Sequence, residues 1–412
     1  MKNCILILIL LTATGILRAQ KARKAIFVIA DGIPADVIES QKTPALKEIA
    51  KEGGYARAYV GGEKDGYSQS PTISAVGYNS LLTGTWANKH NVWDNDITAP
   101  NYNYWNVFRL LETQYPKKKT AVFSTWLDNR TKLVGSEAKA AGNLQPDYFL
   151  DGLELDTIRF PHDTAGYFYY LIDETVTDKA AETIRKSAPD LTWIYLEYTD
   201  EMGHRHGDGD KMNDAVEKMD KQIGRIREAM KYREKNFKED WVIFITTDHG
   251  RDSLKGHDHG GQSDRERTTW IVTDAADLNE RFTKQRPGIV DILPTLTRFL
   301  QLTMTRERLR EVDGVSLTGK LSATDAKAVY RKDKIRVTWK PILQKGLARV
   351  YLSTTDSFAI GGHDKYRLVQ QVPVANGATE FDVSKYPSEV YKISIEMPYN
   401  LLNTRIVIGK KN

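Results

Sequence analysis

The sequence contains a single cysteine, Cys4, among its 412 residues. An intramolecular disulfide needs two cysteines, so the folded chain has to be stabilised by packing and bound groups instead. A large excess of one charge is also lacking, because 59 basic residues face 54 acidic ones and the net charge is +5. Proteins that bind nucleic acids normally carry a strong basic surface, so this balance gives no support to a nucleic-acid duplex as partner.

Long apolar runs are scarce beyond the N-terminus, and no other stretch reaches the roughly 18 apolar residues that cross a bilayer. Residues 1–20 have the pattern of an export signal, in which Lys2 precedes an apolar run and Leu17-Arg18-Ala19 offers a small residue for cleavage. A buried N-terminal helix is the alternative. Cys4 lies inside this predicted signal peptide. We therefore expect a periplasmic or secreted protein with no transmembrane segment and no disulfide after signal removal.

From about residue 24 to 300, short apolar runs alternate with helical patterns. The expected strands cover residues 25–30, 120–123, 191–198, 241–247 and 268–272, and the expected helices cover 44–52, 74–83, 167–187, 208–232 and 290–300. Thr43 stands at the N-cap position of the first of these helices, and Gly84 follows the second. This alternation predicts an α/β fold with a doubly wound, mostly parallel sheet covered by helices on both faces.

The pattern changes after about residue 325 to short runs rich in β-formers. They lie at 335–339, 348–352, 366–369, 379–383, 390–395 and 404–407, and turn residues separate them. Such spacing is typical of an antiparallel β-sandwich. We therefore predict a catalytic domain at 21–326 and a smaller sandwich domain at 327–412. We expect the sandwich to pack on the first domain, and its partner, a glycan or another protein, is left open.

Polar side chains follow three of the expected strands at the point where each strand ends. Asp31 follows the first strand, Asp200 and His204 follow the strand at 191–198, and the Asp248-His249 pair closes the strand at 241–247. Because parallel strands end at the same edge of a sheet, we expect these side chains to meet there. Carboxylates and imidazoles are ligands for divalent cations. The sequence therefore predicts a metal site at this edge.

Each candidate also has a simpler interpretation. Asp200 and His204 share one face of a helix, although Asp200 also suits a helix cap and His204 an exposed loop. Either His257 or His259 could complete the site. A serine that begins a helix, such as Ser74, is most often an N-cap, yet the same place suits a nucleophile that attacks phosphorus.

Together these motifs resemble the alkaline phosphatase superfamily, and most closely its type I phosphodiesterase/nucleotide pyrophosphatase branch. The resemblance runs in order through Asp31, Ser74, Thr83-Gly84, His90, Asn95, Asp200, His204, Asp248, His249 and His259-Gly260. The family's Asn-His after the nucleophile is replaced by Gly77-Tyr78, which weakens a nucleotide assignment more than phosphoester chemistry. The sulfatase pattern of Cys or Ser followed by x-Pro-x-Arg is missing around Ser70 and Ser74.

The resemblance implies two divalent metal ions, zinc first, with manganese also suited to these ligands. One ion would be held by Asp31, Ser74, Asp248 and His249, and the other by Asp200, His204 and His259. Ser74 would be the nucleophile that forms a phosphoseryl intermediate, and Asn95 would donate to the developing oxyanion. We expect a phosphodiesterase that acts on a small phosphoester. The alternatives are a phosphomonoesterase on the same metals, or a metal-stabilised binding protein without catalysis.

Overall fold

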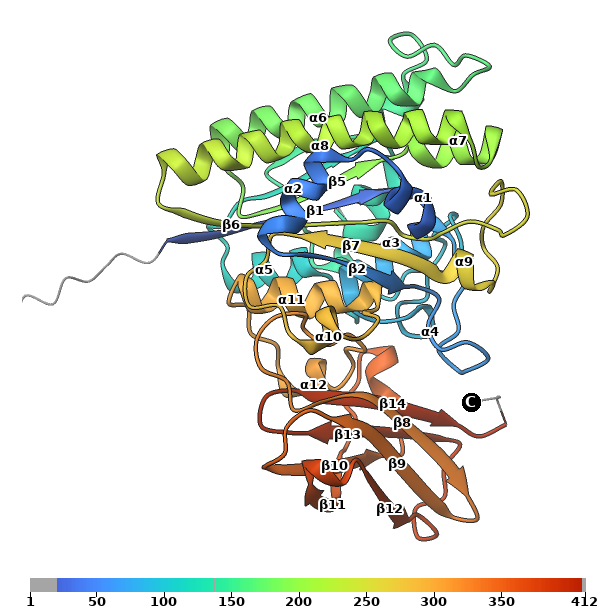
Figure 1. Ribbon diagram of the computed structural model, residues 1–412. Helices are drawn as coiled ribbons and strands as arrows, with labels where there is room; N and C mark the ends of the chain where they lie inside the picture. Colours follow the sequence, from blue (N-terminus) through green and yellow to red (C-terminus); the bar gives the residue numbers. More distant parts are fainter. Residues whose placement is uncertain (1–20, 137, 410–412) are drawn as a thin grey trace, which may run out of the picture.

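The computed structural model describes residues 21–136 and 138–409, so the predicted signal peptide and Cys4 lie outside the described residues. A seven-stranded sheet lies between two layers of helices, and two smaller sheets form a second body at the C-terminal end of the chain (Figure 1). The predicted α/β fold with a smaller antiparallel β-sandwich is therefore confirmed. Within the described ranges, no helix is both long enough and apolar enough to cross a membrane.

The large sheet has the strand order β2-β7-β6-β1-β5-β3-β4. Its strands are β1 (Ala22–Ala30), β2 (Gly54–Tyr59), β3 (Thr120–Ser124), β4 (Tyr148–Leu150), β5 (Leu191–Leu196), β6 (Glu239–Thr246) and β7 (Thr268–Thr273). All run parallel except β7, which is antiparallel to both of its neighbours. Ala30 of β1 pairs with Leu196 of β5, and Ile29 pairs with Thr246 of β6. The three central strands thus end level with one another.

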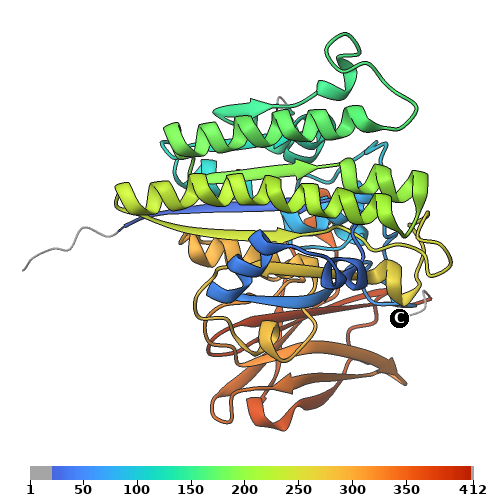
Figure 2. The same cartoon turned by 45° about the horizontal axis from the view of Figure 1, so that its top comes forward.

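Helices cover both faces of this sheet because its central strand is apolar on both sides (Figures 1 and 2). Ile26 and Val28 pack with one set of helices, whereas Phe27 and Ile29, which alternate with them, pack with the other. The first face carries α1 (Ala35–Ser40), α2 (Pro44–Glu52), α6 (Tyr167–Ser187) and α8 (Asp210–Asn236). The second carries α3 (Ser74–Thr83), α5 (Val107–Gln114) and α11 (Ile292–Phe299).

Shorter helices connect these layers. They are α4 (Ala87–His90), α7 (Tyr198–His206), α9 (Asp264–Arg267), α10 (Glu280–Thr283) and α12 (Arg306–Leu309). Helix α7 begins two residues after β5 ends, at the same edge of the sheet where β1 and β6 end. This edge therefore collects the segments that follow three neighbouring strands.

The C-terminal body consists of a four-stranded sheet, β11-β10-β13-β14, and a three-stranded sheet, β12-β9-β8. The strands are β8 (Ala323–Arg331), β9 (Lys334–Pro341), β10 (Leu347–Ser353), β11 (Arg367–Pro373), β12 (Ala378–Asp382), β13 (Val390–Glu396) and β14 (Leu401–Val407). Val337, Val350 and Ile393 belong to the apolar core of this body. The predicted domain boundary at 326/327 falls inside β8 and stays a prediction.

A short helical turn of the sandwich, η5 (Ser357–Ile360), contacts the α/β domain. The carbonyl oxygen of Ala359 accepts hydrogen bonds from the side-chain amides of Asn101 at 2.8 Å and Asn103 at 3.1 Å. The Phe358 ring lies 5.3 Å from the Tyr104 ring, centroid to centroid. The sandwich is thus attached to the segment that follows α4.

Candidate functional site

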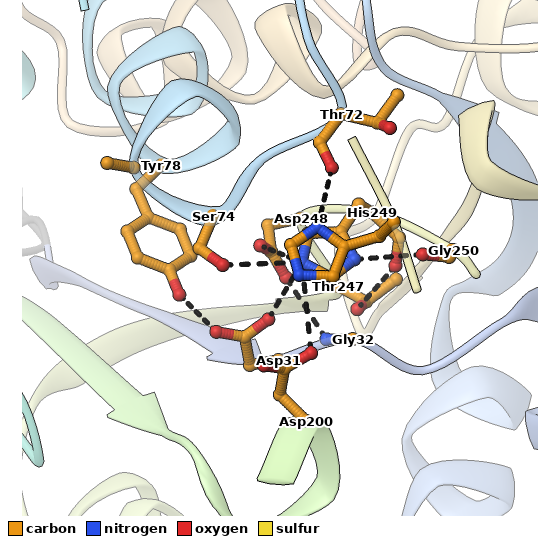
Figure 3. Close-up of polar contacts among 12 residues, drawn as sticks. Asp31, Gly32, Thr72, Ser74, Tyr78, Asp200, Thr247, Asp248, His249 and Gly250 are labelled. Atoms are coloured by element: carbon orange, nitrogen blue, oxygen red, sulfur yellow. Dashed lines mark hydrogen bonds and ion pairs between the residues drawn. The ribbon is translucent and has the colours of Figure 1, made fainter. Parts of the chain in front are cut away.

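The predicted site residues meet at the sheet edge where β1, β5 and β6 end. Ser74 is the first residue of α3, and Asp31 follows β1. Asp248 and His249 follow β6. Figure 3 shows the side chains of these residues directed toward one another. Gly32 makes this convergence sterically feasible. A Cβ atom at Gly32 would lie 2.2 Å from Oδ1 of Asp200, and its φ of +66° also favours glycine.

The imidazole of His249 is the centre of the first group of ligand atoms. Its Nε2 lies 3.3 Å from Ser74 Oγ, 3.3 Å from Asp31 Oδ1 and 3.3 Å from Asp248 Oδ2. Its Nδ1 donates a hydrogen bond to the Gly250 carbonyl oxygen at 2.9 Å. This bond places the ring proton on Nδ1, and Nε2 therefore presents a lone pair to two carboxylate oxygens.

Each of the two carboxylates has one oxygen held by the protein and one oxygen left over. Oδ2 of Asp31 accepts hydrogen bonds from the hydroxyls of Tyr78 and of Tyr195, the latter at 2.7 Å. Oδ1 of Asp248 accepts from the Gly32 amide at 3.2 Å. Asp31 Oδ1 and Asp248 Oδ2 are buried and have no hydrogen-bond partner among the described residues. Buried carboxylate oxygens are costly unless a cation or a donor meets them.

The pKa values of the ionisable side chains in this group are also strongly shifted. Burial, together with the charge of Asp200, raises the pKa of Asp31 to about 7. Burial and the neighbouring charge of Asp31 raise the pKa of Asp248 well above its usual range. Burial lowers the pKa of His249 well below its usual range, so this ring stays neutral. A bound divalent cation would favour the ionised form of both carboxylates, and together with the neutral imidazole they would then form a strong binding site for it.

A second group of ligand atoms lies beside the first and is more open to solvent. Asp200 and His204 share one face of α7, and His204 Nε2 lies 3.2 Å from Asp200 Oδ2 and 3.1 Å from His259 Nε2. Nδ1 of His259 donates to the Thr72 carbonyl oxygen at 2.9 Å, which leaves its Nε2 free. The side chain of His204 is 40 % exposed. This side of the site is therefore the one that is open to solvent.

The structure also distinguishes the two histidines between which the sequence left a choice. His259 directs Nε2 into the second group, and its ring stacks on His249 at a centroid distance of 3.7 Å. His257 instead uses Nδ1 to contact the backbone carbonyl of His204 at 3.0 Å. The Asp200, His249 and His259 ligand atoms lie within 4.8 Å of one another, so His249 borders both groups.

The spacing of these atoms matches what a tetrahedral ion requires. Two ligands of a tetrahedral zinc with bonds of about 2.0–2.1 Å lie about 3.3–3.4 Å apart. The separations from His249 Nε2 are 3.3 Å, and those from His204 Nε2 are 3.1 Å and 3.2 Å. The residues present therefore fit divalent cations.

Asn95 lies beside the nucleophile candidate, in the exposed segment after α4. Its Oδ1 accepts a hydrogen bond from the Ala75 amide at 3.0 Å, in the first turn of α3. In the described part of the chain, nothing accepts a hydrogen bond from its side-chain NH2. The contact thus fixes the amide next to Ser74 and leaves its donors available.

Arg251 is the main functional residue that the sequence analysis missed. It is fully buried, and its guanidinium donates to the carbonyl oxygens of Gly32, Asp200 and His257 at 3.0, 2.6 and 2.8 Å and also to Oδ1 of Asp200. Burial alone would raise the pKa of Asp200, but Arg251 and His204 outweigh it and hold that pKa well below its usual range. One feature of the sequence could have indicated Arg251: it is a charged residue three positions after Asp248, in a segment that follows a buried strand.

Fold and site together define a class of protein. A mostly parallel sheet with a helix-terminal hydroxyl and paired carboxylate-imidazole groups at its edge is the arrangement of the alkaline phosphatase superfamily, a class of metal-dependent ester hydrolases. Residues 25–374 match the profile of the family described as type I phosphodiesterase / nucleotide pyrophosphatase. The chain belongs to this family of phosphoester hydrolases, which confirms the resemblance seen in the sequence.

Individual relatives are distant. A 2,3-bisphosphoglycerate-independent phosphoglycerate mutase from Mesoplasma florum is 27% identical over 173 residues, which cover 39% of this chain and 31% of the mutase. The chain thus spans under a third of that relative's length. A putative sulfatase from Bacteroides thetaiotaomicron has a TM-score of 0.51 at 12% identity, with 89% of this chain and 86% of the sulfatase covered. Human ectonucleotide pyrophosphatase/phosphodiesterase 5 has a TM-score of 0.48 at 15% identity, with 69% and 96% covered. The likeness to the sulfatase shows the fold alone.

Proposed function

We propose that the protein is an exported, two-metal phosphodiesterase that acts on a small phosphoester through a phosphoseryl intermediate on Ser74. The observation that carries this proposal is the convergence of Ser74 Oγ, Asp31 Oδ1 and Asp248 Oδ2 at 3.3 Å from His249 Nε2. Two of these oxygens are buried without a hydrogen-bond partner in the described chain, and a bound cation would compensate them. Family membership supports phosphoester chemistry.

The ligand sets follow from the two groups of atoms. Asp31, Ser74, Asp248 and His249 would hold one ion, and Asp200, His204 and His259 would hold the other. Nitrogen and oxygen ligands at tetrahedral spacing favour zinc over ions that require six oxygen ligands. When bound, the ions would lower the pKa of the serine hydroxyl and neutralise charge on the phosphoryl oxygens.

Ser74 would attack phosphorus in line with the leaving alcohol. Its Oγ would lose the hydroxyl proton and form a bond to phosphorus, while the bond to the leaving oxygen breaks and that oxygen takes up a proton, which gives a phosphoseryl enzyme and a free alcohol. Water would then cleave the new bond and restore the serine. His249 Nε2 lies 3.3 Å from Ser74 Oγ, so both atoms could contact the same ion.

Asn95 would stabilise the negative charge that develops on a phosphoryl oxygen. Its carbonyl oxygen is fixed by the Ala75 amide, so its NH2 group is held in place before substrate arrives. Such a preorganised donor typically contributes about 10²–10³-fold in rate. The side-chain amide is neutral, which suits a diester with one negative charge.

The test compares bis-p-nitrophenyl phosphate with p-nitrophenyl phosphate, using mature protein loaded with zinc. We expect faster hydrolysis of the diester and loss of nearly all activity in Ser74→Ala. Ser80→Ala is the matched control, because Ser80 lies on the same helix outside both ligand groups. Preference for the monoester would instead favour a phosphomonoesterase. Full activity of Ser74→Ala would defeat the proposal, and absence of any turnover with both sites filled would favour a binding protein.

A further inference from the structure

We propose that Tyr78 and Tyr195 are positioning residues that force Asp31 to offer a single oxygen to the cation beside Ser74. This inference rests on the proposed function, since it concerns one of the two metal sites. Both hydroxyls donate to the same oxygen, Asp31 Oδ2, and the Tyr195 bond is 2.7 Å long. The other oxygen, Oδ1, faces His249 Nε2 at 3.3 Å. Figure 3 shows Asp31 between the Tyr78 hydroxyl and the His249 ring. One carboxylate oxygen is thus held by the protein, and the other would be available to a cation.

The two tyrosines reach Asp31 from different elements, Tyr78 from α3 and Tyr195 from β5. Both side chains are buried, and their rings lie 5.1 Å apart at 60°. Tyr78 also meets Trp126 and Trp193 edge-on, at 6.4 and 6.3 Å. Rings packed on several sides cannot rotate their hydroxyls away, so both donors are fixed before a cation binds.

Gly77 allows the approach of α3 on which this arrangement depends. A Cβ atom at Gly77 would lie 2.8 Å from the backbone oxygen of Asp248 and 2.9 Å from its Cβ. Glycine therefore lets the helix lie directly against Asp248, which brings the next residue, Tyr78, within reach of Asp31. Gly77 and Tyr78 together thus bring a tyrosine hydroxyl to the Asp31 carboxylate.

The backbone of Asp31 is fixed as well. Its amide donates to the Leu196 carbonyl oxygen at 3.0 Å, and its carbonyl oxygen accepts from the Thr199 hydroxyl at 2.6 Å. The rotations about the two side-chain bonds of Asp31 are left to control, and the two hydroxyls restrict them. Without them, Oδ2 would lose its donors and the carboxylate could turn both oxygens toward a cation. Hydrogen-bond partners of metal ligands typically contribute about 10–100-fold to metal affinity.

The experiment measures zinc binding to metal-free protein by competition with a chromophoric chelator. The variants are Tyr78→Phe, Tyr195→Phe and the double variant, each of which removes only hydroxyl oxygens from buried rings. We expect one of two zinc dissociation constants to rise about 10–100-fold in the double variant, and the other to stay unchanged. We also expect the ratio of manganese to zinc affinity to rise at the affected site, because a two-oxygen carboxylate suits a larger coordination number.

Tyr104→Phe is the matched control, because Tyr104 is buried and its hydroxyl has no hydrogen-bond partner among the described residues. It should leave both zinc constants unchanged. His204→Ala, which removes a ligand of the other group, identifies the affected site: combined with the double variant, it should leave only the weakened constant.

Two zinc constants within twofold of wild type in all three tyrosine variants would overturn the inference and leave the hydrolase proposal intact. A wild-type protein that binds no zinc would overturn both. If the double variant does not fold, the two single variants decide, and each should weaken the same site.

Discussion

Replacing the buried Arg251 with methionine should cost the metal-free protein a large part of its stability. The guanidinium makes hydrogen bonds to three backbone carbonyl oxygens and to the Asp200 carboxylate, and its side chain is 1% exposed. Methionine fills a similar volume but leaves those acceptors without donors. Breaking one side of a buried ion pair typically costs about 3–5 kcal/mol. We expect a loss of that size in the free energy of unfolding.

Equilibrium urea denaturation of chelator-treated protein measures this loss. Arg225→Met is the matched control, because Arg225 is 34% exposed and pairs with Glu174 and Asp178 on the surface. Exposed ion pairs are typically worth about 1 kcal/mol or less, so the control should stay near wild type. Zinc should recover part of the loss in Arg251→Met, since a cation would neutralise the stranded Asp200. A loss no larger than that of the control would refute the assigned role of Arg251.

Three further predictions concern other parts of the site. Removal of metal by a chelator should lower the urea midpoint. Free zinc at about 1,000 times its Kd should then restore about 4 kcal/mol of unfolding free energy per site. A midpoint that responds to neither the chelator nor zinc would contradict the metal sites. Gly77→Ala should lower stability by about 1–3 kcal/mol despite the better helix former, because its Cβ would lie 2.8 Å from the Asp248 oxygen; a more stable variant would count against this. Burial lowers the pKa of His90 from 6.5 to about 3, and its Nδ1 accepts the Val92 amide, so the folded state binds fewer protons than the unfolded state between these values. The free energy of unfolding should therefore fall as pH drops from about 6.5 toward 3, by up to about 1.4 kcal/mol per unit, and His90→Gln should lose this part of the slope in acid denaturation.

The secondary structure near the site was largely predictable, because local patterns determine it. The helices at 74–83 and 167–187 have the expected bounds, and Gly84 ends the first with a φ of +64°. Thr43 is the N-cap residue of α2, as predicted, but its side chain does not satisfy the first amides of the helix. The Thr43 side chain makes no capping hydrogen bond, and Asp220 of α8 accepts from the Ala45 and Leu46 amides instead. A cap supplied by a distant helix leaves no local signal.

Other errors have similar causes. The strand expected at 191–198 ends at Leu196, because Tyr198 already begins α7. The strand β2, at the sheet edge beside β7, was not predicted, because it is short and its buried side chains, Ala56 and Ala58, give only a weak apolar signal. The strand β8 was also missed, because exposed charged residues interrupt its apolar pattern. In each case contacts with neighbouring strands or helices, and not the local sequence alone, determine where the strand lies.

Most of the predicted ligands were accessible to sequence reasoning because they follow a recognisable strand or begin a recognisable helix. His259 lies in a loop, and only the family resemblance favoured it over His257. The residues that hold those ligands were not accessible in this way. Tyr78 and Tyr195 lie 47 and 164 residues from Asp31 along the chain, and a tyrosine in an apolar segment is typical of ordinary core. Only the packing of α3 on β5 shows that both hydroxyls reach one carboxylate oxygen.

The attachment of η5 to Asn101 and Asn103 has a consequence for how the two bodies work together. Those asparagines belong to the same stretch of chain as Asn95, which reaches the first turn of α3. We therefore expect the β-rich body to help hold this stretch of chain in position. Shortening the chain to its α/β portion would remove the contacts with Ala359, and we expect such a variant to hold Asn95 less firmly.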